Sequence, residues 1–358
     1  MTLNLRELLE EMVERRASDL HITAGERPKL RVDGAITNGA NEQILTPKDT
    51  LQLTYSILTE NQKKRFETED ELDFSFGIQN LSRFRANAYR QRGCVALAIR
   101  QVPFKIQTLQ ELALPGAISK LSDRPRGLVL VTGPTGSGKS TTLAAMLDKI
   151  NRERQGHILT IEDPIEFVHR HQKSMVNQRE VGTDTSSFSQ ALKYALRQDP
   201  DVILVGEMRD LETIQAALTI SETGHLCLAT LHTNSAAETI NRIIDVFPSY
   251  QQSQVRAQLA FVLEGVVTQT LLPKSRGKGR VLAMEVMICT PAIRACIRDD
   301  KVHQIYSIIQ AGKKYGMQTL NDALAQLYMQ GEVSLEDCLK RSSDQTELLR
   351  AVGEPVPA

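Results

Sequence analysis

The chain has 358 residues, which is enough for two ordinary domains with separate cores. Its 43 lysines and arginines balance 43 aspartates and glutamates, so no global field attracts it to nucleic acid or to an anionic membrane. Aromatic residues make up 4% of the chain and tryptophan is absent, which leaves few rings for base stacking and argues against a nucleic-acid partner.

Two features indicate a cytoplasmic protein. Five scattered cysteines without a CxxC pair indicate reduced, buried thiols rather than disulfides or a zinc site. Residues 1–16 carry four glutamates and place Leu5, Leu8, Leu9 and Met12 at helical spacing, which predicts an amphipathic helix and not a signal peptide. Since no run of about 18 apolar residues occurs, we expect no transmembrane segment, and a membrane role only through a partner.

The first hundred residues predict an α+β domain. Short strands are predicted over 18–23, 28–36, 72–76, 83–92 and 94–100, with an Asp33-Gly34 turn and a helical stretch around 47–66. Strands that follow one another without intervening helices favour an antiparallel sheet with helices on one face. Segment 101–112 has an extended character and is predicted to be a linker.

From Leu128 onward the pattern predicts a parallel sheet. Continuous apolar runs, typical of strands buried on both faces, alternate with helical patterns at 128–131, 158–161, 202–205 and 226–231. From about residue 255 to 345 the pattern is mostly helical, broken by a loop over 273–280. The chain as a whole is therefore predicted to be α/β.

The stretch 131-VTGPTGSGKSTTL-143 predicts a phosphate-binding loop, because Gly133, Gly138, Lys139 and Ser140 fit G-x-x-x-x-G-K-[ST] between a buried strand and a helix. Backbone N–H groups of such a loop surround the phosphates, and Lys139 reaches the β- and γ-phosphates of ATP while Ser140 binds Mg²⁺. The expected nucleotide-binding residues are Gly133, Pro134, Thr135, Gly136, Ser137, Gly138, Lys139, Ser140 and Thr141.

Three further side chains are predicted near the phosphates, because the carboxyl ends of parallel strands face the ligand crevice. In 160-TIEDPIE-166 we expect Glu162 to orient and deprotonate an attacking water. In 201-DVILVGE-207 we expect Glu207 to act on Mg²⁺ or its water shell. His232, in 224-GHLCLATLHTN-234, is expected to sense the γ-phosphate in preference to His225.

These four segments, GPTGSGKS, TIEDPIE, DVILVGEMRD and GHLCLATLHTN, resemble in this order the secretion ATPase family of type II secretion and type IV pili. The resemblance implies a PAS-like domain over 1–100, a linker over 101–112, a RecA-like ATPase domain over 113–270 and a helical part over 271–358. Within the family, 17-ASDLHITAGERPKLRVDG-34 and 291-PAIRACIRDDK-301, an AIR-type motif, are most similar to the branch that retracts pili. From periodicity alone, that second segment is an ordinary packed helix with solvated Arg294 and Arg298.

The resemblance also implies that two arginines of the first domain reach the nucleotide and stabilise charge on the transferring phosphoryl group. Arg85 and Arg100 match that placement, and Arg83, Arg90 and Arg92 compete with them. Whether they act within one subunit or across an interface stays open.

The implied function is a cytoplasmic homohexameric ATPase that couples ATP hydrolysis to pilus retraction and twitching motility. Its implied partner is a platform protein of the inner membrane, at whose cytoplasmic face it works. The alternatives are an accessory retraction paralogue, a secretion or pilus-assembly ATPase, and a RecA-like motor that translocates DNA. The missing four-cysteine zinc insertion argues against the assembly type, and the balanced charge argues against DNA.

Overall fold

The computed structural model describes residues 4–32, 34–79, 81–102, 105–277 and 279–356. The chain forms two compact units, one of residues 1–105 with 166–168 and the other of residues 106–165 with 169–358. Residues 103–104 of the predicted linker, and Asp33 of the predicted turn, lie outside the described residues. In the ranges given above, no helix has both the length and the apolar character to cross a bilayer.

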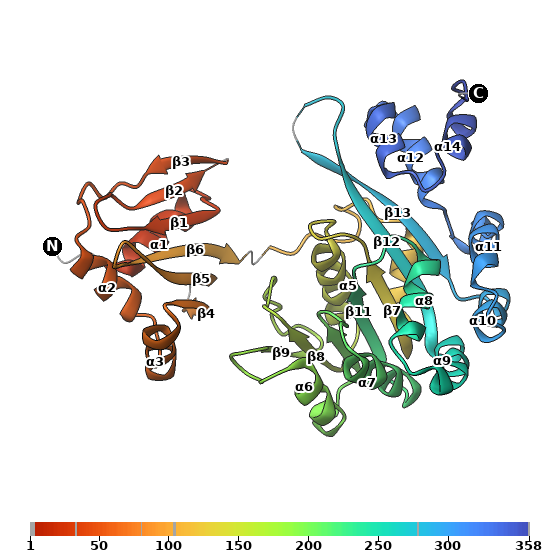
Figure 1. Cartoon of the computed structure of the whole chain (residues 1–358), viewed down its shortest axis with the longest axis horizontal. Helices are drawn as coiled ribbons and strands as arrows, with labels where there is room; N and C mark the ends of the chain where they lie inside the picture. Colours follow the sequence, from red (N-terminus) through yellow and green to blue (C-terminus); the bar gives the residue numbers. More distant parts are fainter. Residues whose placement is uncertain (1–3, 33, 80, 103–104, 278, 357–358) are drawn as a thin grey trace. The chain divides into compact units, whose positions relative to one another are not determined.

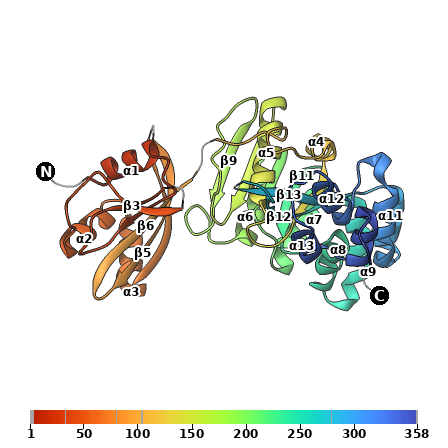
Figure 2. The ribbon, with the colours of Figure 1, turned by 90° about the horizontal axis from the view of Figure 1, so that it is seen from above.

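The first unit is a six-stranded antiparallel sheet with the order β3-β2-β1-β6-β5-β4. Its elements are α1 (Leu5–Glu14), β1 (Asp19–Ile22), β2 (Lys29–Val32), β3 (Ala35–Asn38), α2 (Pro47–Tyr55), α3 (Glu60–Glu69), β4 (Glu71–Ile78), β5 (Ser82–Gln91) and β6 (Cys94–Val102). Helices α1 and α2 lie against one face of the sheet (Figures 1 and 2). Leu9 and Met12 of α1 pack there with Phe84 and Leu97, which confirms the predicted α+β arrangement.

The helix predicted around 47–66 is two helices. Thr46 caps α2 through a reciprocal pair of hydrogen bonds with Asp49. Thr59 caps α3 in the same way with Gln62. Because each cap satisfies N–H groups that a helix start leaves without partners, the second cap begins a new helix within the predicted stretch.

The second unit is built around a seven-stranded sheet with the order β13-β12-β7-β11-β10-β8-β9, parallel except for β13. Its strands are β7 (Gly127–Thr132), β8 (His157–Glu162), β9 (Met175–Glu180), β10 (Val202–Val205), β11 (Leu226–Leu231), β12 (Leu263–Pro273) and β13 (Arg280–Ile288). Its α-helices are α4 (Gly116–Ser122), α5 (Lys139–Glu153), α6 (Phe188–Ala195), α7 (Leu211–Glu222), α8 (Ala236–Asp245), α9 (Ser249–Val262), α10 (Pro291–Arg298), α11 (Ile305–Ala311), α12 (Leu320–Met329), α13 (Leu335–Arg341) and α14 (Gln345–Val352), and short 3₁₀ turns span Leu196–Gln198, Val302–Gln304 and Lys313–Tyr315.

Helices cover both faces of this sheet. Helices α4 and α5 pack on one face through Ile118, Leu143 and Met146, and α6 to α11 pack on the other (Figure 2). The central strands β7 and β11 are buried along their whole length. The four apolar runs of the sequence are therefore the inner strands of a doubly covered parallel sheet, as predicted.

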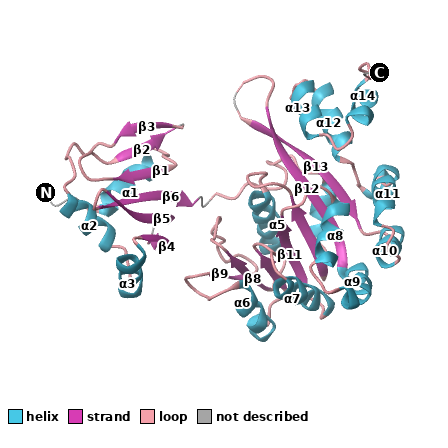
Figure 3. Cartoon of the chain, in the orientation of Figure 1, coloured by secondary structure: helices cyan, strands magenta, loops and turns pink. Residues whose placement is uncertain are grey.

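The region from 255 to 345 differs from its mostly helical prediction. Strands β12 and β13 pair as a long antiparallel hairpin at one edge of the sheet (Figure 3), and helices resume only at α10. Helix α9 passes directly into β12 at Leu263, without the glycine or proline that usually marks such a change. The strand β13 is rich in Leu, Ala, Met and Glu, which favour helices when read alone.

Candidate nucleotide site

The phosphate-binding loop joins β7 to α5 at the carboxyl end of the parallel strands. Gly133, Gly136 and Gly138 have φ values of 137°, 77° and 90°, which lie in the left-handed region that side chains disfavour. The ammonium of Lys139 donates to the carbonyl oxygens of Gly133 at 2.9 Å and Pro134 at 3.1 Å. The lysine ammonium is thus held at the start of a loop whose backbone has the turns that an anion nest requires.

This loop runs very close to the neighbouring strand β12. A Cβ atom on Gly133 would lie 2.2 Å from the carbonyl oxygen of Gln269, so only glycine permits this approach. The side-chain amide of Gln269 donates to the carbonyl of Ser137 at 2.8 Å. The motif glycines therefore serve packing against β12 as well as phosphate access.

Glu162 is the last residue of β8, at the carboxyl ends of the parallel strands, where the loop also lies. One of its carboxylate oxygens accepts hydrogen bonds from the Thr160 hydroxyl at 2.7 Å and the Gln178 amide at 3.1 Å. The amide oxygen of Gln178 in turn accepts from the backbone N–H of His169 at 2.8 Å. The carboxylate that we expect to orient water is therefore held by two neutral donors.

Glu207 and His232 come together beyond the ends of β10 and β11. The His232 ring Nε2 lies 3.1 Å from one carboxylate oxygen of Glu207, and Arg209 contacts the other at 2.7 Å. Burial tends to raise the pKa of Glu207, but the hydrogen bond from Arg209 and the neighbouring His232 outweigh it and lower that pKa below its ordinary value. Glu207 is thus favoured as a carboxylate, the form that can act on a metal ion or its water.

Three predicted residues remain, namely His225 and the two arginines of the first unit. His225 precedes β11, whereas His232 follows it, so the two histidines lie at opposite ends of one strand. Arg85 and Arg100 belong to the first unit, where they are direct cross-strand partners on β5 and β6. Arg100 also donates to Asp19 at 2.8 Å.

The AIR-type motif forms α10, and its two arginines differ. Arg294 is not a solvated charge: it donates to the carbonyls of Ala260 at 2.7 Å and Phe261 at 2.8 Å, in the last turn of α9. It also pairs with Glu264 at 2.8 Å, and its side chain is 27% exposed. Arg298 is 60% exposed and pairs with the adjacent Asp299. Arg294 therefore caps the C-terminus of α9, where a cation is favoured.

Three residues in contact with the site were missed by the sequence analysis, namely Thr160, Gln178 and Gln269. Thr160 stands two positions before Glu162 on one strand, so the period of two could have placed both on the same face. Gln178 lies opposite Thr160 on β9, a strand that was not predicted. Gln269 lies on β12, inside the region read as helical, so no local signal pointed to it.

The residue types at the site fit a magnesium ion. The Ser140 hydroxyl and the Glu207 carboxylate are oxygen donors, which this hard cation prefers. Among the described residues, no group of three or more His, Cys, Asp or Glu is arranged to hold a metal. Magnesium at phosphate sites typically takes one or two protein ligands and completes its shell with water and phosphate oxygens.

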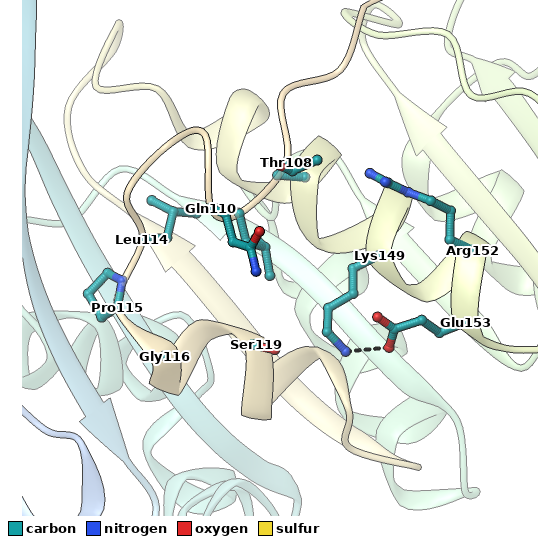
Figure 4. Close-up of a pocket in the computed structure, with 11 residues that line it drawn as sticks. Thr108, Gln110, Leu114, Pro115, Gly116, Ser119, Lys149, Arg152 and Glu153 are labelled. Carbon is teal, nitrogen blue, oxygen red and sulfur yellow. Dashed lines mark hydrogen bonds and ion pairs between the residues drawn. The ribbon is translucent and has the colours of Figure 1, made fainter.

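A separate cavity of about 380 Å³ lies beside the far half of α5 (Figure 4). It is lined by the segment that enters α4, including Thr108 and Pro115, and by Lys149 and Arg152 of α5. Lys149 pairs there with Glu153 at 2.6 Å. Lys149 lies ten residues after Lys139 on the same helix, about 15 Å along its axis. The cavity is therefore distinct from the phosphate-binding loop.

Comparison with known proteins supports the reading of the motifs. Residues 2–340 match the family described as type II/IV secretion system protein. Over 340 residues the chain is 52% identical to the type IV pilus retraction ATPase PilT of Pseudomonas aeruginosa. This match covers 95% of this chain and 98% of that protein. Over 346 residues it is 43% identical to the type IV pilus ATPase PilU of the same organism, with coverage of 97% and 90%.

A solved structure extends the likeness to three dimensions. The crystal structure of the pilus retraction motor PilT with bound ADP is 52% identical and matches with a TM-score of 0.91, covering 97% of this chain and 99% of that one. The match spans both units and confirms the predicted fold class, an α+β domain followed by a P-loop ATPase domain.

Proposed function

The chain belongs to the type II/IV secretion system protein family, and from this premise we propose that it is an ATP-hydrolysing motor that retracts a type IV pilus. The observation that carries the proposal is the 52% identity, over 95% of the chain, to a protein named as a pilus retraction ATPase. The identity to the pilus ATPase PilU is lower, at 43%. The reaction is hydrolysis of ATP to ADP and phosphate, coupled to mechanical work.

In the proposed reaction, the loop over residues 133–141 holds the phosphates through its N–H groups, and Lys139 adds positive charge at the β- and γ-phosphates. Glu162 orients the attacking water and accepts its proton. His232 responds to the γ-phosphate through a hydrogen bond. Magnesium, when held by Ser140 and Glu207, neutralises charge on the phosphate oxygens.

The motor itself requires the first unit. We propose that Arg85 and Arg100 stabilise the transferring phosphoryl group, with the segment 101–112 as the hinge between a PAS-like domain and a RecA-like one. Closure and reopening around successive nucleotides in a homohexameric ring then turn a platform protein at the cytoplasmic face of the inner membrane. This part of the proposal rests on the family resemblance.

Rival functions make different predictions. If the chain were an accessory PilU-like ATPase, its deletion would leave retraction partly intact. If it were a type II secretion or pilus-assembly ATPase, its deletion would abolish secretion or pili. A DNA-translocating motor would show DNA-stimulated hydrolysis, which the net charge of +0 does not favour. For a retraction motor, deletion leaves abundant pili that do not retract.

Replacing Lys139 tests the catalytic part of the proposal. Lys139→Ala removes the charge at the phosphates and should lower ATP hydrolysis at least about 100-fold, measured as phosphate release. Lys149→Ala is the matched control, because it removes a lysine from the same helix beside the separate cavity. Normal hydrolysis by Lys139→Ala would show that the nucleotide site is assigned wrongly.

A further inference from the structure

A buried glutamine on β12 contacts the phosphate-binding loop from behind. Gln269 is 1% exposed and lies one residue beyond the last pair between β12 and β7, where β7 gives way to the loop. Its side-chain amide donates to the Ser137 carbonyl at 2.8 Å. A Cβ on Gly138 would stand 3.2 Å from the same amide nitrogen. The loop and this side chain are thus packed together at the Ser137–Gly138 peptide.

The bond from Gln269 fixes the orientation of that peptide. A trans peptide is planar, and its C=O and N–H point in opposite directions. Because the Ser137 carbonyl points toward Gln269 on β12, the Gly138 N–H points away from that side chain, and N–H groups of such a loop surround the phosphates. Without the donor on β12, the carbonyl would be buried without a partner and the peptide would be free to rotate.

Two buried polar atoms beside this bond support a role in ligand binding. Within the described residues, the Gln269 Oε1 and the Ser137 hydroxyl have no hydrogen-bond partner, although Ser137 is only 3% exposed. Buried polar groups are almost always paired, and those that are not call for an explanation. Both atoms belong to the two residues that share the hydrogen bond to the Ser137 carbonyl, so an acceptor and a donor remain open where the loop meets β12.

We propose that Gln269 is a positioning residue of the nucleotide site, which orients the Gly138 N–H toward the phosphates of ADP and ATP. This inference rests on the proposed nucleotide site and extends it to a strand outside the four motif segments. Its role is to hold the loop ready for phosphate before the ligand arrives, so its loss weakens binding more than it slows the chemical step.

The test compares two glutamine substitutions in the full-length protein. Gln269→Met keeps the length of the side chain without the donor, and Gln269→Glu keeps its shape but presents a carboxylate to the Ser137 carbonyl. Gln318→Met is the matched control, because its amide donates at 2.9 Å to the carbonyl of Met284, the residue paired with Gln269 on β13, and the substitution thus removes a similar hydrogen bond from the same part of the sheet. The Kd for ADP is measured by calorimetry, KM and kcat by phosphate release, and folding by Tm without nucleotide.

We expect Gln269→Met to raise the Kd for ADP and the KM for ATP about tenfold, with kcat within about threefold of the parent. Gln269→Glu should weaken ADP further, and Gln318→Met should bind within about twofold of the parent. ADP binding within twofold by Gln269→Met, or equal weakening by Gln318→Met, overturns the proposal. ADP binding is measured without turnover, so an overturned role for Gln269 can be told apart from an overturned motor function. The second would appear as absent ATP hydrolysis by the parent protein.

Discussion

The proposed role of Glu162 in orienting water can be tested at the level of a single carboxylate. Its oxygen Oε1 accepts hydrogen bonds from Thr160 and Gln178, which hold the side chain in one orientation. Glu162→Gln keeps the shape but removes the proton acceptor, so kcat should fall at least about 100-fold while ADP binding is retained. The exposed neighbour Asp163 provides the control, and Asp163→Asn should change kcat less than about threefold. Equal losses in both variants would contradict the role of Glu162.

His169 predicts a pH dependence of stability. Burial lowers its pKa from 6.5 to about 4, because the charged form cannot be solvated there. The unfolded chain binds a proton at about pH 6.5 and the folded chain only near pH 4. The contribution of His169 to the free energy of unfolding is therefore fully present above pH 6.5 and is lost as the pH falls, by about 2 kcal/mol at pH 5.

Urea unfolding at pH 7 and pH 5 measures this dependence. His169→Gln should lose about 2 kcal/mol less than the parent between the two pH values, because its side chain does not titrate. His303→Gln, which replaces an exposed histidine, should keep the slope of the parent. An unchanged slope in His169→Gln would show that other groups dominate the acid sensitivity.

At the level of residues, the sequence predicted what is local and missed what is distant. The phosphate loop carries its own signature within eight positions, 133–140, and could be predicted with its strand and helix. Gln269 contacts the same loop from 132 positions away along the chain. A single sequence contains no signal for such a contact, which depends on the order of strands in the sheet.

Among the elements, the same division follows the physics of burial. Strand β10 was predicted over its observed span of 202–205, and β11 over 226–231, because strands buried on both faces are continuous apolar runs. Strand β9 lies at the edge of the sheet, and four of its six residues are polar, without a regular alternation of buried and exposed positions. It was missed because that pattern resembles a loop.

The end of α9 gives a prediction at this scale. Arg294 donates to two carbonyls in the last turn of α9 and pairs with Glu264, which also binds Arg124 at 3.1 Å. Arg294→Ala removes the donor to the two carbonyls and one of the two cations at Glu264, and it should lower the free energy of unfolding by about 2 kcal/mol. Arg298→Ala, on the same helix but 60% exposed, should change it by less than about 0.5 kcal/mol. Urea unfolding distinguishes them, and equal small effects would refute the capping role.

For the whole molecule, the question is how the first unit contributes to hydrolysis. Its sheet carries a cross-strand row of Arg85, Arg100, Asp19 and Arg31 on four adjacent strands. Burial tends to raise the pKa of Asp19, but hydrogen bonds from Ser18 and Arg100 outweigh it and lower that pKa. Asp19 therefore stays ionised and holds the Arg100 guanidinium in place. The side chain of Arg100 nevertheless remains 67% exposed. Such an arginine is oriented by the sheet yet accessible to a phosphate.

Arg100 and Arg31 provide a comparison within this row, since both contact Asp19, at 2.8 Å and 3.8 Å. If Arg100 stabilises the transferring phosphoryl group, Arg100→Ala should lower kcat at least about 100-fold and leave the Kd for ADP within about threefold of the parent. Arg31→Ala removes a charge from the same row and should leave kcat within about threefold. Phosphate release and calorimetry on the two variants decide the matter. A loss of ADP binding equal to the loss of kcat would mean that Arg100 supports the fold or the ground state, and another arginine would then have to stabilise the transferring phosphoryl group.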